Sequence, residues 1–331
     1  MTAGTLSPAG RSTPFERPAL ARLPDQLLKW TLTGLAAAIL ALIAYFFVKL
    51  YSEASPVFSR YGIFHFAFNN EWVPSKQTYG ALPLIVGTLI TSAIALLIGV
   101  PVAVASALYI TELAPRRLKQ PLTVLVELLA AVPSVVYGLW GVFVLIPRLQ
   151  GFEKWVNSTF SFLPFVGGQV SGPNYFIAGL ILAIMILPIV SAISREVMAT
   201  VPVEHKEAAL ALGATRWEMI RIAVLPYSRA GISGAAMLGL GRAIGETIAA
   251  TLVIGNAAVI GKTLFSQGYT LAAVIANEFG EAASDKTHRA ALIAAGLVLF
   301  VLTLIVNAIA RYFVIRAESK TARRVPQGMA G

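Results

Sequence analysis

Long apolar runs separated by polar segments organise most of this chain. Several runs keep a predominantly apolar character for about 18 or more positions, which is long enough for a helix to cross a bilayer. The pattern predicts six transmembrane helices, at residues 27–50, 82–109, 122–146, 175–193, 230–254 and 289–314. The fold class is therefore an all-α polytopic membrane protein.

Polar segments lie before, between and after these runs. Residues 1–26 form a polar tail rich in Pro, Ser and Arg, without a periodic apolar face, and we expect it to be mostly disordered. Residues 51–80 form an aromatic-rich loop, which we interpret as a belt at the membrane interface in preference to a recognition surface. The core covers residues 81–314, and a basic tail follows at 315–331.

Composition agrees with a membrane protein. Hydrophobic residues make up 57% of the chain, charged residues 13%, and the mean hydropathy is +0.74, outside the range of soluble domains. The chain has no cysteine, which excludes a disulfide framework and a Cys-ligated metal, and we expect no metal site. In a soluble protein the net charge of +10 would suggest nucleic acid, but here the cations lie between apolar runs. We therefore expect a lipid bilayer around the chain and no nucleic-acid partner.

The distribution of these cations predicts the orientation. Of the 26 Lys and Arg residues, 17 lie in or beside the N-terminal tail, the 111–121 turn, the 194–229 loop and the C-terminus. Cytoplasmic segments carry the excess of Lys and Arg in membrane proteins. Both termini are therefore expected in the cytoplasm of a multi-pass protein of the bacterial inner (plasma) membrane, with the 51–80 loop outside.

The loop at residues 200–229 is the one long segment with an amphipathic, charged pattern. Pro202 fits the first turn of a short helix, and Gly213 fits the position just past its end. Thr215 and Glu218 have the spacing of a capping box, which begins a second helix, and Pro226 is expected to stop or kink it. The sequence thus predicts two short helices joined at Gly213.

The second of these helices carries an apolar stripe of Trp217, Ile220 and Val224. The loop resembles the EAA loop of permeases from binding-protein-dependent ABC importers at Glu207, Ala208, Ala209, Gly213, Leu225 and Pro226. It departs from the family where Ala223 replaces the usual Ile. The resemblance implies a coupling helix that docks in a cleft of a separate ATPase subunit, whereas the helix signals alone fit an ordinary cytoplasmic loop equally well.

Three ionisable residues lie within the predicted spans and clear of their ends, namely Glu127, Arg242 and Glu246. Charges at that depth are costly and need a partner or a wet cavity. Arg242 and Glu246 are four residues apart, so on a continuous helix they share a face and can pair. From the residues alone, a self-neutralising ion pair and a role in a transport path remain equal alternatives.

Two further stretches resemble the PstC-type permeases of phosphate ABC importers: GLGRAIGETIAAT at 239–251 and ELLAAVPSVVYG at 127–138. This resemblance implies a type I ABC importer permease that forms half of a phosphate path, with Arg242 contacting the anion and Glu246 holding Arg242. Glu127 is assigned to packing or gating, and Pro133 and Pro188 to helix kinks that serve packing or gating.

The same resemblance implies the partners: a PstA-type permease, two PstB-type ATPase subunits and an external PstS-type phosphate-binding protein. We expect ATP and Mg²⁺ on the ATPase and no enzymatic activity in this chain. Its Gly261-Lys262-Thr263 ends like a P-loop, but Asn256 stands where the first Gly should be. A sulphate or molybdate ABC permease is the alternative within this class, and a secondary phosphate transporter is the alternative outside it.

Overall fold

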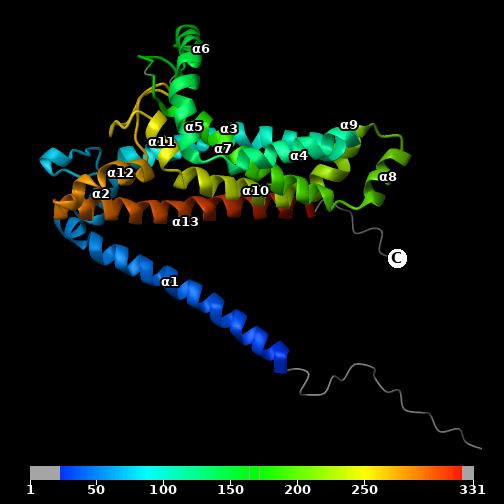
Figure 1. Ribbon diagram of the computed structural model, residues 1–331, viewed down its shortest axis with the longest axis horizontal. Coiled ribbons are helices and arrows are strands. Elements are labelled where there is room, and N and C mark those ends of the chain that lie inside the picture. Colours follow the sequence, from blue (N-terminus) through cyan, green and yellow to red (C-terminus); the bar gives the residue numbers. More distant parts are fainter. Residues whose placement is uncertain (1–22, 164, 171, 323–331) are drawn as a thin grey trace, which may run out of the picture. The chain divides into compact units, whose positions relative to one another are not determined.

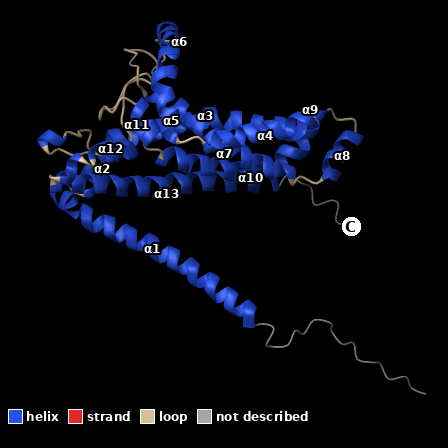
Figure 2. Ribbon diagram, viewed as in Figure 1, coloured by secondary structure: helices blue, strands red, loops and turns tan. Residues whose placement is uncertain are grey.

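The computed structural model describes residues 23–163, 165–170 and 172–322. Residues 1–22 of the N-terminal tail predicted at 1–26 lie outside this range, as does the basic tail from 323 onward. Residues 23–26, for which the sequence predicts disorder, are helical. The described chain is mostly helical, and no strand forms within it (Figure 2). The α-helices are α1 (Leu23–Tyr61), α2 (Ile63–Phe68), α3 (Leu82–Leu108), α4 (Arg116–Ala131), α5 (Ser134–Trp140), α6 (Ile146–Thr159), α7 (Tyr175–Ala199), α8 (Val203–Ala211), α9 (Arg216–Met219), α10 (Leu225–Gly245), α11 (Ile248–Val253), α12 (Leu271–Glu278) and α13 (Lys286–Ala322).

Shorter helical turns connect several of these elements. Three π-helical turns continue α3, α5 and α9, at Tyr109–Leu113, Gly141–Leu145 and Ile220–Val224. Two 3₁₀ turns lie at Pro74–Lys76 and Glu281–Ala283. Residues 315–322 of the predicted basic tail continue α13 as helix.

The described chain divides into two units, one that ends at Lys49 and one that begins at Leu50. In the described part of the first unit, α1 exposes apolar side chains such as Leu28, Trp30 and Leu40. A helix that is apolar all round and long enough to span is suited to lipid on every side. The helix runs on to Tyr61, so it extends well beyond the span predicted at 27–50.

In the second unit, α3, α4, α7, α10 and α13 run side by side (Figure 1). Helix α7 lies among them and contacts α3, α4 and α10. Small residues allow this close approach: a Cβ on Gly179 would lie 2.5 Å from the Ile94 side chain of α3, and one on Gly231 would lie 2.4 Å from the Val197 side chain of α7. The bundle therefore depends on glycine at helix contacts, as membrane bundles commonly do.

Among the described residues, five helical segments are long and apolar enough to cross a membrane: Gln26–Tyr61, Leu82–Leu113, Ser134–Thr159, Tyr175–Ala199 and Lys286–Arg316. The spans predicted at 82–109, 175–193 and 289–314 fall within three of them, and the first run falls within the segment at the N-terminus. The count of six spans and the side on which the termini lie stay predictions.

The span predicted at 122–146 is wrong in its bounds. Helix α4 ends at Ala131, and Pro133 is the N-cap of α5. Proline has no N–H to donate and disfavours helical backbone at the preceding Val132, so it ends one helix and starts another instead of kinking a single one. The apolar segment that begins here continues into α6, which projects away from the bundle (Figure 1).

The span predicted at 230–254 is interrupted too, because α10 ends at Gly245 and α11 starts at Ile248. Helix α10 lies in the bundle but is not among the five apolar segments, since Arg229, Arg242 and several glycines lower its hydropathy. Pro188 differs from Pro133: α7 runs through it as one helix.

The interfacial belt predicted for residues 51–80 is wrong for half of its aromatic residues. Phe58, Phe66, Trp72 and Tyr79 are buried in one apolar cluster with residues of α12 and α13. Others, such as Phe64, are exposed. Burial against helices more than 190 positions away in the sequence is a tertiary effect that the aromatic content of the segment cannot show.

Candidate coupling elbow and transport path

Residues 203–224 form the predicted pair of short helices, which we call the elbow. Helix α8 ends at Ala211, and Gly213 then turns the chain with φ +83°, a backbone conformation that favours glycine. The capping box at the start of α9 is confirmed: the Thr215 Oγ1 accepts from the Glu218 N–H at 3.3 Å, and the Glu218 Oε2 accepts from the Thr215 N–H at 2.7 Å. The Thr215 N–H, together with the Thr215 hydroxyl, which donates to the same Oε2 at 2.8 Å, lowers the pKa of the Glu218 carboxyl.

One side of the elbow is packed against the bundle. Ala209, Ile220 and Val224 are buried in an apolar cluster with Ala107 of α3 and Met198 of α7. Because α9 has only four residues before the π-helical turn changes the hydrogen-bond spacing, the predicted stripe divides. Its Ile220 and Val224 face the core, whereas Trp217 is 62% exposed.

The other side is open. Leu212, Trp217 and Ile222 are exposed apolar side chains, and Glu207 and Ala208 are exposed as well. A hollow of about 420 Å³ lies between the two arms, lined by Glu204, His205, Ala208, Ala209, Leu212, Ile222 and Ala223. Exposed apolar residues grouped on a surface of this kind are typical of a protein interface.

The last residues of the predicted motif begin the next helix. Leu225 is the first residue of α10 and Pro226 the second, and both follow the π-helical turn without a break, because Val224 and Leu225 have helical backbone angles. The prediction that Pro226 stops the second elbow helix is therefore wrong. The chain is helical from Arg216 to Gly245, so the elbow leads directly into a helix of the bundle.

The two interrupted spans meet inside the bundle. Helices α5 and α11 pack so closely that a Cβ on Gly138 would lie 2.6 Å from the Leu252 side chain and 3.1 Å from the Ala249 backbone. A hollow of about 300 Å³ lies beside the first interruption, lined by Leu129, Val132, Val136, Tyr137, Trp140 and Ile184. Broken helices at membrane depth are tolerated where they line a cavity or are buried in protein, and transporters use them to build substrate sites.

Arg242 lies one turn before the second interruption and is exposed. The predicted pairing of Arg242 with Glu246 is wrong: no ion pair joins them in the described part of the chain, because α10 ends at Gly245 and Glu246 is extended, with φ −70° and ψ 130°. The Glu246 Oε1 instead accepts from the Ala249 N–H of α11 at 3.3 Å. The guanidinium is thus left without an acidic partner on its own helix.

Glu127 pairs with a residue that the sequence assigned to a loop. The Arg195 Nη2 of α7 lies 3.4 Å from the Glu127 Oε1 of α4, and the Arg195 Nη1 donates to the Thr123 Oγ1 at 2.9 Å. The Arg195 side chain is only 13% exposed. Sequence reasoning missed Arg195 because it stands near the end of an apolar run, where an arginine reads as an interfacial cation. This contact between neighbouring helices agrees with a packing role for Glu127.

Comparison with known families bears on this arrangement of elbow and broken helices. Residues 99–319 match the family described as the inner membrane component of binding-protein-dependent transport systems. The chain belongs to this family. It is thus a transport permease, a multi-pass component of the inner membrane, as predicted.

Curated relatives of this permease cover most of its length. It is 44% identical over 304 residues to a phosphate transport system permease protein PstC of Mesorhizobium japonicum, covering 90% of this chain and 92% of that one. It is 42% identical over 305 residues to the PstC of Pasteurella multocida, covering 91% and 94%.

A solved structure supports the fold. A bacterial alginate ABC transporter in complex with an alginate pentasaccharide-bound periplasmic protein matches the permease with a TM-score of 0.57 and 21% identity, covering 90% of this chain and 98% of that chain. At this identity the likeness concerns the fold, and the predicted ABC importer permease fold is confirmed.

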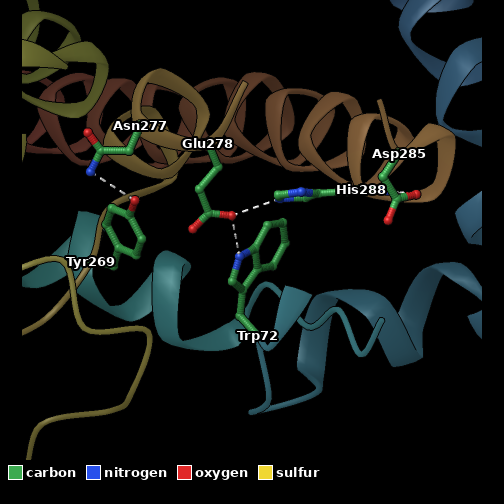
Figure 3. Close-up of polar contacts among 6 residues, drawn as sticks. All are labelled: Trp72, Tyr269, Asn277, Glu278, Asp285 and His288. Atoms are coloured by element: carbon green, nitrogen blue, oxygen red, sulfur yellow. Dashed lines mark hydrogen bonds and ion pairs between the residues drawn. The ribbon is translucent and has the colours of Figure 1, made fainter. Parts of the chain in front are cut away.

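At the far end of the bundle from the elbow, the permease holds a polar cluster (Figure 3). The Glu278 Oε2 of α12 accepts from the Trp72 Nε1 at 3.0 Å and lies 2.9 Å from the His288 Nε2 of α13. The Tyr79 ring stacks on His288 with centroids 5.7 Å apart. Burial, together with the charge of Asp285, raises the pKa of Tyr79 to about 12. The cluster fastens the 51–80 segment to α12 and α13.

Proposed function

We propose that this permease forms half of the translocation path for inorganic phosphate in an ATP-driven importer. Two relatives named as phosphate transport permeases, each at least 42% identical over at least 90% of this chain, are the observation that carries the phosphate assignment. In this proposal the elbow receives a separate ATPase, and both termini lie in the cytoplasm. This chain hydrolyses no ATP itself and binds no cofactor, because ATP and Mg²⁺ belong to the partner.

The elbow has the properties that a mechanical contact needs. Its outer side exposes Leu212, Trp217 and Ile222, of which Leu212 and Ile222 line a hollow, while its inner side is buried against α3 and α7. The capping box and the turn at Gly213 fix the angle between the two helices. When a partner bound to the outer side moves, the elbow therefore moves as a rigid unit and displaces the bundle helices that it contacts.

Arg242 is the residue in this chain best suited to contact phosphate. A guanidinium offers a planar fork of donors that matches two oxygens of a tetrahedral anion. In the described part of the chain Arg242 is exposed and not paired with Glu246, so its donors are available to a passing anion. Glu246 sits just beyond it, and we propose that its negative charge limits how tightly the anion is held, because a path must release its substrate.

The assembly we propose contains a PstA-type permease as the other half of the path, two PstB-type ATPase subunits and an external PstS-type binding protein. Glu127, Pro133 and Pro188 are placed in helix packing and gating: Glu127 links α4 to α7, Pro133 separates α4 from α5, and Pro188 lies inside α7. We assign no direct contact with the anion to these three residues.

The experiment that tests the substrate is accumulation of labelled oxyanions by the complete complex in proteoliposomes. Phosphate should accumulate, and unlabelled phosphate should compete for it far better than sulphate or molybdate. Accumulation of sulphate or molybdate in place of phosphate would overturn the substrate assignment while leaving the permease assignment intact. The double variant Arg242→Gln with Glu246→Gln should transport no phosphate in this assay, because it lacks the proposed anion contact. Its two side chains do not form a self-neutralising pair in the described part of the chain, so their joint removal is not expected to be harmless.

A further inference from the structure

The C-terminal end of α3 is joined to the elbow by an ion pair. Helix α3 continues into the π-helical turn Tyr109–Leu113, and Glu112 in this turn points its Oε1 to within 2.7 Å of the Lys206 Nζ of α8. Both side chains are largely covered, with exposed fractions of 9% for Glu112 and 19% for Lys206. A charged hydrogen bond of this length in a partly covered site is short and directional.

The π-helical turn is held from a second side as well. The Lys119 Nζ of α4 donates to the backbone carbonyl of Thr111, next to Glu112. Carbonyl groups at the end of a helix lack helical partners, and here a lysine side chain supplies one. The π-helical turn therefore has directional contacts to both α4 and α8, so a displacement of α8 displaces the turn as well.

The remaining contacts of α8 with other described residues hold no ion pair. The His205 ring meets the Tyr227 ring of α10 edge to face, with centroids 6.2 Å apart. Helix α8 packs on α9 and on the turn Ile220–Val224, and its buried Ala209 belongs to an apolar cluster that includes Ala107 of α3. Apolar contacts are non-directional and allow surfaces to slide. In the described part of the chain, the ion pair with Glu112 is the one salt bridge between the elbow and a bundle helix.

Helix α3 is well placed to pass a movement on. It packs along α7 and against α10, the helix that carries Arg242. Lys206 directly precedes Glu207, the first residue of the motif on the outer side of the elbow. A force applied to α8 by a partner thus reaches α3 through one ion pair besides the apolar cluster, and from α3 it reaches the helices beside the proposed path.

We propose that Glu112 and Lys206 are positioning residues for coupling, which convert the movement of the ATPase-bound elbow into a movement of α3. This inference rests on the proposed function, since it requires an ATPase at the elbow. A coupling role differs from a purely structural role in its effect on transport. Without the ion pair, the ATPase should still bind and hydrolyse ATP, but less phosphate should be transported for each ATP hydrolysed.

The test uses the complete complex in proteoliposomes, with Glu112→Gln, Lys206→Gln and the exchange of Glu112→Lys with Lys206→Glu. Glu196→Gln is the matched control, because Glu196 is an exposed carboxylate near the same end of the bundle. ATPase binding, ATP hydrolysis and phosphate uptake are each normalised to membrane-inserted permease. We expect each single change to keep ATPase binding and to lower uptake per ATP by about tenfold, and the exchange to restore most of it.

A second measurement does not depend on how well the charge variants fold. The chain has no cysteine, so Glu112→Cys with Lys206→Cys introduces a unique thiol pair that a short reducible cross-linker can join. Uptake per ATP should be high in the linked complex and fall when the linker is reduced in the same vesicles.

The results separate this inference from the proposed function. If wild-type complex transports phosphate and the single variants keep normal uptake per ATP, the inference is wrong and the proposed function stands. Loss of ATPase binding in proportion to uptake, an exchange no better than the singles, or linked and reduced complexes that transport equally would also overturn it. A wild-type complex that moves no phosphate would instead refute the proposed function.

Discussion

Replacing Gly213 tests whether the bend of the elbow sets its affinity for the ATPase. The φ angle at this position is +83°, where a side chain costs about 1–2 kcal/mol in backbone energy. A Cβ added there would meet no atom within 4 Å, so Gly213→Ala changes the backbone energy without disturbing the packing. The strained elbow should populate other conformations, and only the native bend presents both α8 and α9 to the partner.

The expected effect follows from that energy. A cost of 1–2 kcal/mol lowers the binding-competent fraction, and hence raises the apparent Kd for the ATPase, by up to about 5- to 30-fold. Gly213→Asn should have a smaller effect than Gly213→Ala, because Asn tolerates this conformation better. The assay is titration of purified ATPase onto the permease in nanodiscs.

Gly151→Ala supplies the control for this series. Gly151 lies inside α6 with no atom within 4 Å of an added Cβ, and alanine is favoured over glycine in a helix. It should leave the Kd unchanged. Equal affinity for wild type, Gly213→Asn and Gly213→Ala would refute the reasoning, as would a change of the same size at Gly151.

Three further predictions concern the path, the cap and the polar cluster. Arg242→Lys should strongly reduce phosphate uptake while ATP hydrolysis continues, because an ammonium lacks the planar fork. Thr215→Ala should destabilise α9 by about 1 kcal/mol, which would be measured as faster exchange of its backbone amide hydrogens. In wild type, the protection of these amides from exchange should decrease as the pH falls below 4.5, the ordinary pKa of a Glu carboxyl, and through the lowered pKa of Glu218. Trp72→Phe removes a donor to Glu278 and should lower the Tm by an amount equivalent to about 1–3 kcal/mol.

Each of these has a result that contradicts it. Normal uptake by Arg242→Lys would remove the bidentate anion contact. Protection of α9 that is insensitive to Thr215→Ala, or that strengthens on acidification, would show that the capping box does not hold the elbow. An unchanged Tm for Trp72→Phe would mean that the hydrogen bond from the indole to Glu278 does not stabilise the fold.

What the sequence predicts well is local. The runs at α3, α7 and α13 are apolar over their whole length, so their helices follow from hydropathy alone. The three-residue spacing of Thr215 and Glu218 predicts the capping box, and the glycine at position 213 predicts the turn. The capping box and the turn of the elbow are therefore predictable from local sequence.

What the sequence does not predict depends on tertiary contacts or on the ends of helices. The helix ends at Val132 and Glu246 lie inside long apolar stretches, and hydropathy does not report backbone angles, so the sequence pattern does not predict them. The pair of Glu112 and Lys206 joins residues 94 positions apart, and nothing in either local sequence indicates the other. Burial of Trp72 against α12 has the same origin.

The central claim is that a separate ATPase drives phosphate through this permease. The most direct measurement is phosphate uptake by vesicles that contain this chain alone, compared with vesicles that also contain the second permease and the ATPase, each supplied with phosphate-loaded binding protein and internal ATP. The chain alone should take up no phosphate, and the complete complex should accumulate it in an ATP-dependent manner. Uptake by the chain alone, driven by a proton gradient and indifferent to ATP, would contradict the central claim and identify a secondary transporter.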